Sequence, residues 1–422
     1  MESLEIQGFA GFKDLKIELN KINLFIGPQA SGKSVLMKLA YFFRNIYSNF
    51  PWHFFNGISI LDKEADKNFK KTFPISSWPK DSAFSISYQL NGYVIYIKRE
   101  PNEQNIRLDT SKTTKDWIDN YISTFTNVSE ILSRGENPVD FYGVYDEYHL
   151  EEDFRNDFIQ KLKTASLATN KIVPSGRSFF AFLQENIFSF LRSENELDPS
   201  FVDFASEYER MKKTLARENR EGRELLPLEQ ELEVLIQQVL KGKYVQEVDG
   251  DFLSLADGRH INLLQASSGQ QEVLPLLQVI RHWFRRTKTA VSLYIEEPET
   301  HLFPQAQRQV LEALILMYNA HEEDMHLEIS THSPYLISVL NNMLLAGQLA
   351  QNEKVDQKAL DQKHPSYLRV KKEELSAYML KDGAAFSLWD EETGLLNAQI
   401  LDEVGENIDR DFDELLNLEP YE

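Results

Sequence analysis

The stretch NLFIGPQASGKSVLMKLA, residues 23–40, joins an apolar run to a segment with helical spacing through a loop of small residues. Residues 27–34 fit the pattern G-x-x-x-x-G-K-[ST], in which glycines let successive backbone N–H groups converge on phosphate oxygens. Residues 22–26 are typical of a buried strand, and residues 35–43 of a helix whose positive dipole end lies behind the loop. The sequence therefore predicts a phosphate-binding loop; the alternative is an ordinary glycine-rich turn.

Several residues of this loop are expected to contact a nucleotide. We expect Lys33 to reach the β- and γ-phosphates and Ser34 to bind Mg²⁺. The other predicted nucleotide contacts are Gly27, Gln29, Ala30, Ser31 and Gly32.

The composition limits the class of protein. The chain has 422 residues, enough for two or three packed units. Its net charge is −21, so bulk charge would not attract nucleic acid or an anionic membrane, and any DNA contact needs a local basic patch. There is no cysteine, which excludes disulfides, thiolate metal sites and a cysteine nucleophile.

We find no pattern of a targeting signal or a membrane-spanning helix in the sequence. Residues 1–19 alternate like a strand and lack the basic start and apolar middle of a signal peptide. No apolar run approaches the roughly 20 residues that a membrane-spanning helix needs. We therefore expect a cytoplasmic protein with no membrane partner.

Short strands dominate the first hundred residues. Residues 4–9 and 12–19 alternate in polarity and precede the buried strand of the loop. Residues 84–88 and 93–98 are joined by Asn91-Gly92, which is a strong hairpin signal.

Helical periodicity dominates from about residue 110 to residue 240. One helix is expected after Asp198-Pro199 and another over residues 228–239, with a polar stretch at residues 217–224 between them. The two helices either run back on each other as a short arm or pack on the core. Strands return at residues 243–248 and 252–255.

A second informative run covers residues 289–304, TAVSLYIEEPETHLFP. Residues 290–295 read as a buried strand, and Glu296 and Glu297 follow at its C-terminal end, where open α/β sheets bind ligands. Beside a phosphate loop, we expect Glu296 to orient hydrated Mg²⁺ and Glu297 to polarise the water that attacks the γ-phosphorus. An exposed acidic turn is the alternative.

A third run, QASSGQQE at residues 265–272, precedes an apolar helix at residues 273–279. Hydroxyl residues and a glycine at a helix N-terminus make an anion site, although a plain helix cap fits equally well. The predicted contacts are Ser267, Ser268, Gly269 and Gln270. Since one active site hardly needs two phosphate-binding turns, we expect the second to face a nucleotide held by another copy of the chain.

Together these motifs resemble the ABC-type ATPases, within the branch that contains SMC and RecF-like proteins and the OLD-like ATPases of phage defence. ASSGQ at residues 266–270 is similar to the L-S-G-G-Q signature, and LYIEEPE at residues 293–299 to the Walker B strand. EISTHSP at residues 328–334 resembles the strand with the switch histidine, which makes His332 the expected γ-phosphate sensor.

The resemblance implies an α/β fold: a P-loop NTPase head with a mixed central sheet flanked by helices, an antiparallel β subdomain and an inserted helical arm. The corresponding divisions are residues 1–110 and 243–345 for the head, 111–242 for the insertion and 346–422 for a small α+β extension. It also implies ATP and Mg²⁺ as cofactors, ATP hydrolysis, and a homodimer closed by ATP, with a higher oligomer left open.

Four family features are altered, open in their role or unplaced. Glu296 stands where the family usually has Asp, so turnover could be slow. Gln29-Ala30 replaces the more usual Asn-Gly, and alanine restricts a backbone that glycine leaves free. Arg177, in IVPSGRS, resembles the arginine of a Pro-x-x-Arg element and would contact phosphate, contact the partner subunit or form a structural salt bridge. The Q-loop glutamine has no assigned position.

The biological role has two candidate readings. Residues 367–370, 376–380 and 386–389 are expected to form a small sheet, followed by a helix over residues 397–418. Because this tail is too short for the Toprim nuclease of OLD-like enzymes, we expect a sensor or clamp that controls a separately encoded effector such as a nuclease.

The alternative role is a repair or chromosome ATPase that grips DNA directly. The candidate DNA contacts are Arg217, Arg220 and Arg223. Glu218, Glu221 and Glu224 are interleaved with them, so a plain exposed charge cluster is also possible.

Overall fold

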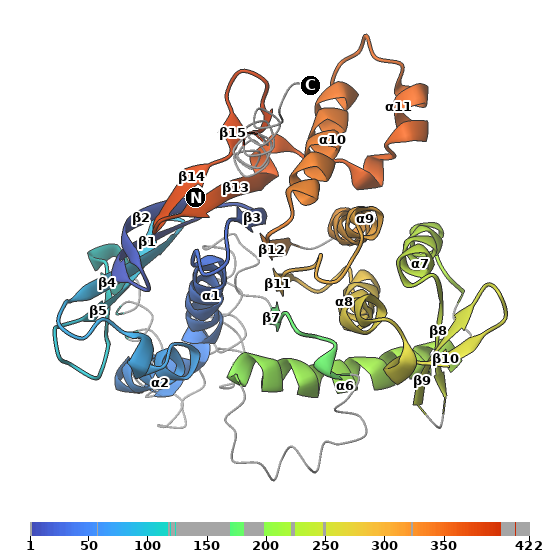
Figure 1. The fold of residues 1–422 in the computed structure, drawn as a ribbon. Coiled ribbons are helices and arrows are strands. Elements are labelled where there is room, and N and C mark those ends of the chain that lie inside the picture. Colours follow the sequence, from blue (N-terminus) through green and yellow to red (C-terminus); the bar gives the residue numbers. More distant parts are fainter. Residues whose placement is uncertain are drawn as a thin grey trace, which may run out of the picture.

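The computed structural model of the chain (Figure 1) describes residues 2–56, 58–116, 119, 123, 169–180, 198–220, 224–247, 250–321, 324–397 and 410.

A six-stranded mixed sheet forms the centre of the molecule. Its order is β14-β13-β3-β12-β11-β7; the five strands from β13 to β7 are parallel, and β14 is an antiparallel edge. The bounds are β3 Ile22–Ile26, β7 Thr169–Val173, β11 Val291–Glu296, β12 Met325–Thr331, β13 Leu375–Lys381 and β14 Ala384–Ser387. Every residue of β3 and β12 is buried, because helices or a second sheet cover both faces of these strands.

Two strands of this sheet come from segments expected to lie outside the head. β7 belongs to the predicted insertion at residues 111–242, yet it pairs with β11. β13 belongs to the predicted extension at residues 346–422, yet it pairs with β3. The central sheet therefore spans the divisions proposed at residues 110, 242 and 345.

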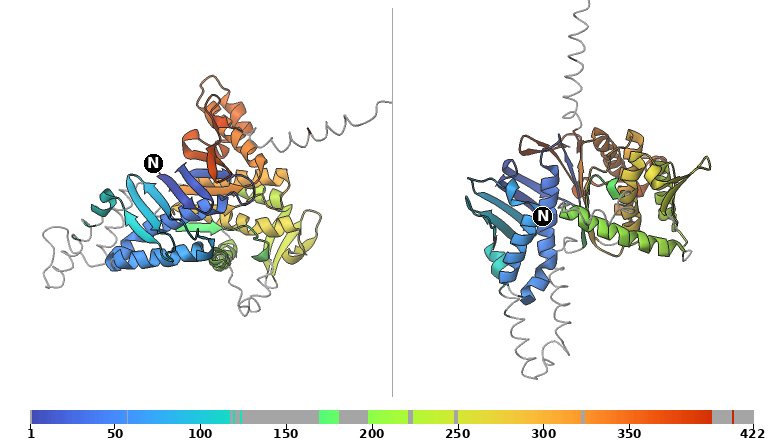
Figure 2. Two further views of the ribbon diagram at one scale, coloured as in Figure 1. Left: turned by 60° about the vertical axis from the view of Figure 1, so that its left-hand side comes forward. Right: turned by 60° about the horizontal axis from the view of Figure 1, so that its bottom comes forward.

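An antiparallel sheet of order β2-β1-β4-β5-β6 lies on one side of the central sheet (Figure 2). Its strands are β1 Glu2–Phe9, β2 Phe12–Leu19, β4 Phe84–Leu90, β5 Tyr93–Arg99 and β6 Arg107–Thr110. The predicted hairpin is β4–β5, in which Asn91 and Gly92 both have positive φ, 48° and 92°. These values suit the two-residue turn that the right-handed twist of the strands requires.

Helices cover the two faces of the central sheet, and successive residues of β3 face different cores. Phe25 faces the core shared by the antiparallel sheet and helix α1, whereas Leu24 and Ile26 face the core formed by α8, α9 and α10. The helices are α1 Lys33–Asn56, α2 Ile58–Thr72, α6 Pro199–Arg220, α7 Pro227–Leu240, α8 Ser268–Phe284, α9 Pro304–Ala320, α10 Pro334–Ala350 and α11 Gln357–Lys363. The fold is thus the predicted α/β class with a mixed sheet and an antiparallel β subdomain.

The two helices predicted late in the insertion exist as α6 and α7, and both pack on the core. Phe204 and Tyr208 of α6 and Leu232 and Ile236 of α7 are buried in the same cluster as α8 and α9. Of the two alternatives, a free arm is therefore wrong for these helices. Arg223 of the proposed DNA-contacting tip lies outside the described residues.

The smaller elements agree in part with expectation. The predicted strands at residues 243–248 and 252–255 are β8 Gly242–Glu247 and β9 Gly250–Leu255, joined by an unexpected third strand, β10 His260–Asn262. The strand predicted at residues 367–370 is wrong: a 3₁₀ turn, Ser366–Leu368, stands there directly after Pro365. The strands β15 Trp389–Asp390 and β16 Leu395–Leu396 form a two-stranded ribbon. Of the helix predicted over residues 397–418, all but residues 397 and 410 lie outside the described residues.

Candidate functional site

The predicted phosphate loop connects β3 to α1 with a tightly packed backbone. A Cβ on Gly27 would lie 2.3 Å from the carbonyl oxygen of Leu380, and one on Gly32 would lie 2.3 Å from the ring of Phe12. Both positions therefore require glycine. Ala30 has φ 60°, so this residue adopts the left-handed conformation despite its side chain.

Lys33 is buried at the start of α1 and turns back onto its own loop. Its Nζ donates to the carbonyl oxygens of Gly27 at 2.9 Å and Pro28 at 2.8 Å, and lies 3.5 Å from Nδ1 of His332. Burial lowers the pKa of the ammonium group, while the charges of Glu297 and Glu299 act to raise it. A phosphate would offer this ammonium stronger acceptors than carbonyl oxygens do.

The hydroxyls of Ser31 and Ser34 fit the phosphates and the metal ion that the motif implies. Oγ of Ser31 is buried and has no hydrogen-bond partner among the described residues, so it has a donor free for a phosphate oxygen. Ser34 is exposed at the first turn of α1, where the backbone N–H groups and the helix dipole favour an anion and its metal ion. Gln29 is exposed as well.

Strand order brings the other predicted catalytic residues to the same edge of the sheet. β12 lies between β3 and β11, and all three run parallel, so their C-terminal ends meet beside the phosphate loop. Glu296 ends β11 and Glu297 follows it, while His332 follows β12. Nε2 of His332 lies 3.6 Å from Oε1 of Glu297, and both side chains are about one-third exposed. The structure therefore brings Lys33, Glu297 and His332 together.

The backbone of Glu297 is unusual for a residue with a side chain. Its φ is 44°, and its carbonyl oxygen accepts hydrogen bonds from Nη2 of Arg177 at 3.0 Å and Oγ1 of Thr300 at 3.0 Å. Oγ1 of Thr300 also lies 3.2 Å from Oε2 of Glu297. Such a conformation costs roughly 1–3 kcal/mol and persists only where the surroundings fix it.

Glu299 lies within the candidate site, although motif reasoning quoted it without assigning it a role. Its Oε1 accepts the backbone N–H of His332 at 2.7 Å, which ties the loop after β11 to the loop after β12. Its Oε2 is buried without a hydrogen-bond partner among the described residues. The signal was available, since Glu299 is the third carboxylate of the run at residues 296–299.

The predicted metal ligand Glu296 has a backbone neighbour two residues beyond the end of β7. The N–H of Ser175 lies 3.4 Å from its Oε2, so the end of β7 adjoins the predicted metal position. Within the described residues, no group of three or more His, Asp or Glu side chains forms a self-sufficient metal site. Mg²⁺ at nucleotide sites usually has one or two protein ligands and takes the rest from phosphates and water, and Ser34 and Glu296 fit that pattern.

The second predicted phosphate turn begins helix α8. Ser267 is its N-cap and forms a capping box with Gln270, whose Nε2 also donates to the carbonyl of Leu240 at 2.6 Å. Ser267 and Ser268 are exposed, and Gly269 is buried. The Gln270 side chain and the Ser267 hydroxyl are therefore both used in capping the helix, whereas Ser268 is exposed.

Arg177 is fully buried and contacts carbonyls and a carboxylate within its own chain. It donates from Nη1 to the carbonyl of Glu296 at 2.7 Å and from Nε to the carbonyl of Glu272 at 3.1 Å, and its N–H donates to Oε1 of Glu272 at 2.8 Å. Burial lowers the pKa of this guanidinium, and Glu272 opposes that effect. Among the three expectations for Arg177, the structural salt bridge is the one that the structure shows.

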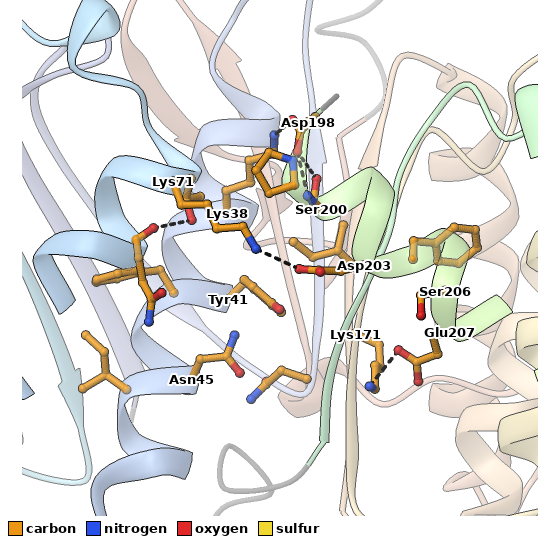
Figure 3. A pocket seen from close by; sticks show the side chains of 18 of the residues that line it. Lys38, Tyr41, Asn45, Lys71, Lys171, Asp198, Ser200, Asp203, Ser206 and Glu207 are labelled. Carbon is orange, nitrogen blue, oxygen red and sulfur yellow. Dashed lines mark hydrogen bonds and ion pairs between the residues drawn. The ribbon is translucent and has the colours of Figure 1, made fainter. Parts of the chain in front are cut away.

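A separate pocket of about 460 Å³ lies between α1, α2, β7 and α6 (Figure 3). Lysines from α1, α2 and β7 pair across it with acids at the start of α6 or within it. These pairs are Lys38–Asp198 at 2.8 Å, Lys71–Asp203 at 3.4 Å and Lys171–Glu207 at 2.7 Å. The three pairs thus join α6, or the residue just before it, to α1, α2 and β7.

The proposed DNA-contacting segment has part of its charge engaged. Glu218 pairs with Arg285 at 3.0 Å and with Arg286 at 2.9 Å, both at the end of α8. Arg217 is exposed on α6. The described part of the segment therefore mixes acids and bases.

Among the helices of the described ranges, none combines the length and apolarity that crossing a membrane would take.

Comparisons with known proteins agree with the presence of an ATPase domain. Residues 149–337 match the family described as AAA ATPase domain, a stretch that includes the α8 turn, Glu296, Glu297 and His332. No curated protein sequence matches the chain.

Solved structures with a similar arrangement include two SMC head domains. The Smc head of Pyrococcus furiosus, bound to the C-terminal domain of ScpA, has 12% identity and a TM-score of 0.39, and covers 96% of this chain and 100% of its own. The SMC head of Thermotoga maritima has 10% identity and a TM-score of 0.36, over 92% and 98%. The recombination mediator RecF, solved with a nucleotide analogue, has 12% identity and a TM-score of 0.30, over 92% and 97%.

Proposed function

We propose that the chain binds ATP with Mg²⁺ and hydrolyses it at a site completed by a second copy of the chain. The observation that carries this proposal is the convergence of Lys33, Glu297 and His332. The three come from separate parts of the sequence, and their side chains are linked in series by separations of 3.5 and 3.6 Å. A chance glycine-rich turn would not place a lysine, a partly exposed carboxylate and a histidine in this order.

Each of these residues has a distinct task in the proposed reaction. Lys33 exchanges two carbonyl acceptors for phosphate oxygens, and Ser34 and Glu296 hold the metal ion. Glu297 orients and polarises the attacking water, and His332 donates to the transferred phosphoryl group. Mg²⁺ supplies neutralisation of the charge that develops between the β- and γ-phosphates.

Exposed groups beside this site support completion by a second copy. Ser268 is exposed at the start of α8; Ser267 is exposed as well, although its hydroxyl is engaged with Gln270 in the capping box. Phe303, six residues after Glu297, is 81% exposed, and Tyr335, three residues after His332, is 52% exposed. Aromatic side chains beside a polar site are typical of surfaces that become buried on association.

The proposal of two copies also gives the α8 turn a ligand. With nucleotide on Lys33 of one copy, Ser268 and Gly269 of the other would contact its γ-phosphate. Nucleotide then closes the dimer and hydrolysis opens it. Control of a separately encoded effector in phage defence, and direct DNA binding in repair, stay predictions from the sequence resemblance.

Phosphate release by the purified chain with ATP and Mg²⁺ tests the proposal. We expect turnover that stops when EDTA removes Mg²⁺ and that Lys33→Ala abolishes together with nucleotide binding. Lys38→Ala is the matched control, because Lys38 lies on the same helix but pairs with Asp198. Binding of a fluorescent ATP analogue that is equal in the wild type and in Lys33→Ala would refute the proposed site.

A further inference from the structure

Arg177 joins three segments that carry different parts of the proposed site. Its guanidinium donates to the carbonyls of Glu296 and Glu297 at 2.7 and 3.0 Å, and to the carbonyl of Pro174 at the end of β7 at 2.9 Å. Through its Nε and backbone N–H it is also bound to Glu272 of α8. One side chain thus connects the helix of the second phosphate turn to the backbone of the catalytic carboxylates.

This connection is buried and saturated with hydrogen bonds. The side chains of Arg177 and Glu272 are 0% and 1% exposed, and Oε2 of Glu272 also accepts the N–H of Ser178 at 2.8 Å. An ion pair in such a place is rigid, because losing either partner leaves the other charge buried and unpaired. Displacement of Glu272 would therefore displace Arg177.

Glu297, at the other end of these contacts, has a strained backbone that neighbouring side chains hold in place. Glu297 has φ 44°, a strained value for a non-glycine residue. Arg177 holds its carbonyl oxygen from one side and Thr300 from the other. Loss of the Arg177 contact would let the backbone at Glu297 relax. The direction of the Glu297 side chain would then change as well.

A second contact links α8 to the same loop. Gly269, in the second phosphate turn, packs so closely on the loop that a Cβ there would lie 2.6 Å from the carbonyl oxygen of His301. His301 also has positive φ, 60°. The start of α8 therefore touches the loop after Glu297 directly, while Glu272, one turn along the helix, reaches it through Arg177.

We propose that Arg177 is a positioning residue that couples helix α8 to the catalytic Glu297 of the same copy. This inference rests on the proposed function, in which the start of α8 contacts the nucleotide of the partner. Contact between Ser268 and the partner's γ-phosphate fixes α8, and Glu272 and Arg177 then fix Glu297 against its own nucleotide. Each copy thereby hydrolyses ATP only when its partner is loaded, which makes the two sites positively cooperative.

Glu272→Gln is the primary test, because it removes the charge of the pair while keeping its shape and one acceptor. We expect the affinity of a single copy for a fluorescent ATP analogue to change less than about twofold. We expect kcat to fall about tenfold or more, since small displacements of a catalytic group have effects of this size. The Hill coefficient for ATP, whose upper limit is two for two sites, should fall toward one.

A second variant and a matched control separate positioning from general stability. Arg177→Lys keeps the charge but cannot make the forked contacts to two carbonyls, so it should reproduce the loss of kcat and of cooperativity. Glu233→Gln is the control: it breaks another ion pair to α8, with Arg281 at 2.5 and 2.6 Å, that has no link to Glu297. It should keep wild-type kcat and Hill coefficient.

The outcomes separate this inference from the proposed function. If the wild type hydrolyses ATP cooperatively and Glu272→Gln does so equally well, the coupling is refuted while the proposed function stands. An equal loss in Glu272→Gln and Glu233→Gln also refutes it, because helix stability alone would then explain the effect. If the wild type does not bind ATP, the proposed function itself fails.

Discussion

Nζ of Lys33 lies 3.5 Å from Nδ1 of His332, although the two residues are 299 positions apart in the sequence. The parallel pairing of β3 with β12 produces this approach, since both residues follow the C-terminal ends of these strands. His332 thus lies within 3.6 Å of both Lys33 and Glu297. In the proposed reaction, phosphate binding and water activation depend on different residues of this group, so substitutions should separate them.

Glu297→Gln should bind ATP and fail to hydrolyse it. The amide keeps the size of the side chain but cannot polarise water, so kcat should fall by about 10²-fold or more. Because hydrolysis opens the proposed dimer, the variant should accumulate as a closed dimer with ATP and Mg²⁺, measured by light scattering. The double variant Lys33→Ala, Glu297→Gln should stay monomeric, and a single variant that remains as monomeric as the wild type would contradict the scheme.

Ala30→Gly should stabilise the protein, whereas an alanine-to-glycine change is usually destabilising. Ala30 has φ 60°, where a Cβ costs roughly 1–2 kcal/mol, and glycine avoids that cost. Since glycine also gains freedom in the unfolded chain, the net gain should be at most about 1 kcal/mol. Urea unfolding measures it. Ala40→Gly, within α1, should lose stability by about 1 kcal/mol or more, and the same sign for both variants would contradict the argument.

Local patterns in the sequence predicted the parts of the site that depend on local structure. The loop at residues 27–34, the hairpin turn at Asn91-Gly92 and the strand ending in Glu296 each have a pattern that short stretches of chain determine. Their positions follow from strand period, turn chemistry and helix caps. Lys33, Glu297 and His332 each lie in such a local pattern, and the pairing of β12 with β3 and β11 then brings them together.

The remaining features depend on pairing between distant segments. β7 and β13 are short strands of mixed polarity whose places in the central sheet are set by β11 and β3, and nothing within their own residues specifies those partners. The role of Arg177 stayed open and Glu299 stayed unassigned because the sequence does not show burial. An arginine after a strand reads equally well as a phosphate ligand or as a structural ion pair until its partner Glu272 is known.

Phe303→Ser should weaken ATP-dependent dimerisation without changing nucleotide binding by a single copy. Phe303 is 81% exposed beside the site, and burying a phenylalanine contributes roughly 1.5–3 kcal/mol, or about tenfold or more in dimer affinity. Analytical ultracentrifugation in the Glu297→Gln background measures the dissociation constant. Phe386→Ser is the control, because Phe386 is 52% exposed on the edge strand β14. Equal effects of the two changes would place the dimer surface elsewhere.

Glu328 gives the fold a pH dependence that can be traced to one carboxyl group. It is fully buried on β12, where its Oε1 accepts from Arg44 at 2.6 Å and Asn23 at 2.9 Å. Burial raises its pKa to about 7; Arg44 lowers it, and Glu2, which shares Arg44, raises it further. The nearby His326 is also buried, and its pKa is lowered by burial and by Arg44.

The sign of the effect follows from the raised pKa. Because folded Glu328 keeps its proton up to about pH 7 while the unfolded group loses it near 4.5, its contribution is complete at low pH and disappears as pH rises through 7. The lowered pKa of His326 changes stability in the opposite direction: it reduces the free energy of unfolding as pH falls below 6.5, the ordinary pKa of histidine. Between pH 6.5 and 8, Glu328 should therefore lower the free energy of unfolding by about 1 kcal/mol.

Glu328→Gln should remove this loss, because an amide does not titrate. Urea unfolding at pH 6.5 and at pH 8 should show the wild type losing about 1 kcal/mol more than the variant over that interval. Glu18→Gln, an exposed carboxylate on β2, should keep the wild-type difference. If Glu328→Gln loses as much stability as the wild type between these pH values, the carboxyl is already ionised in the folded protein, and Arg44 then outweighs the effect of burial.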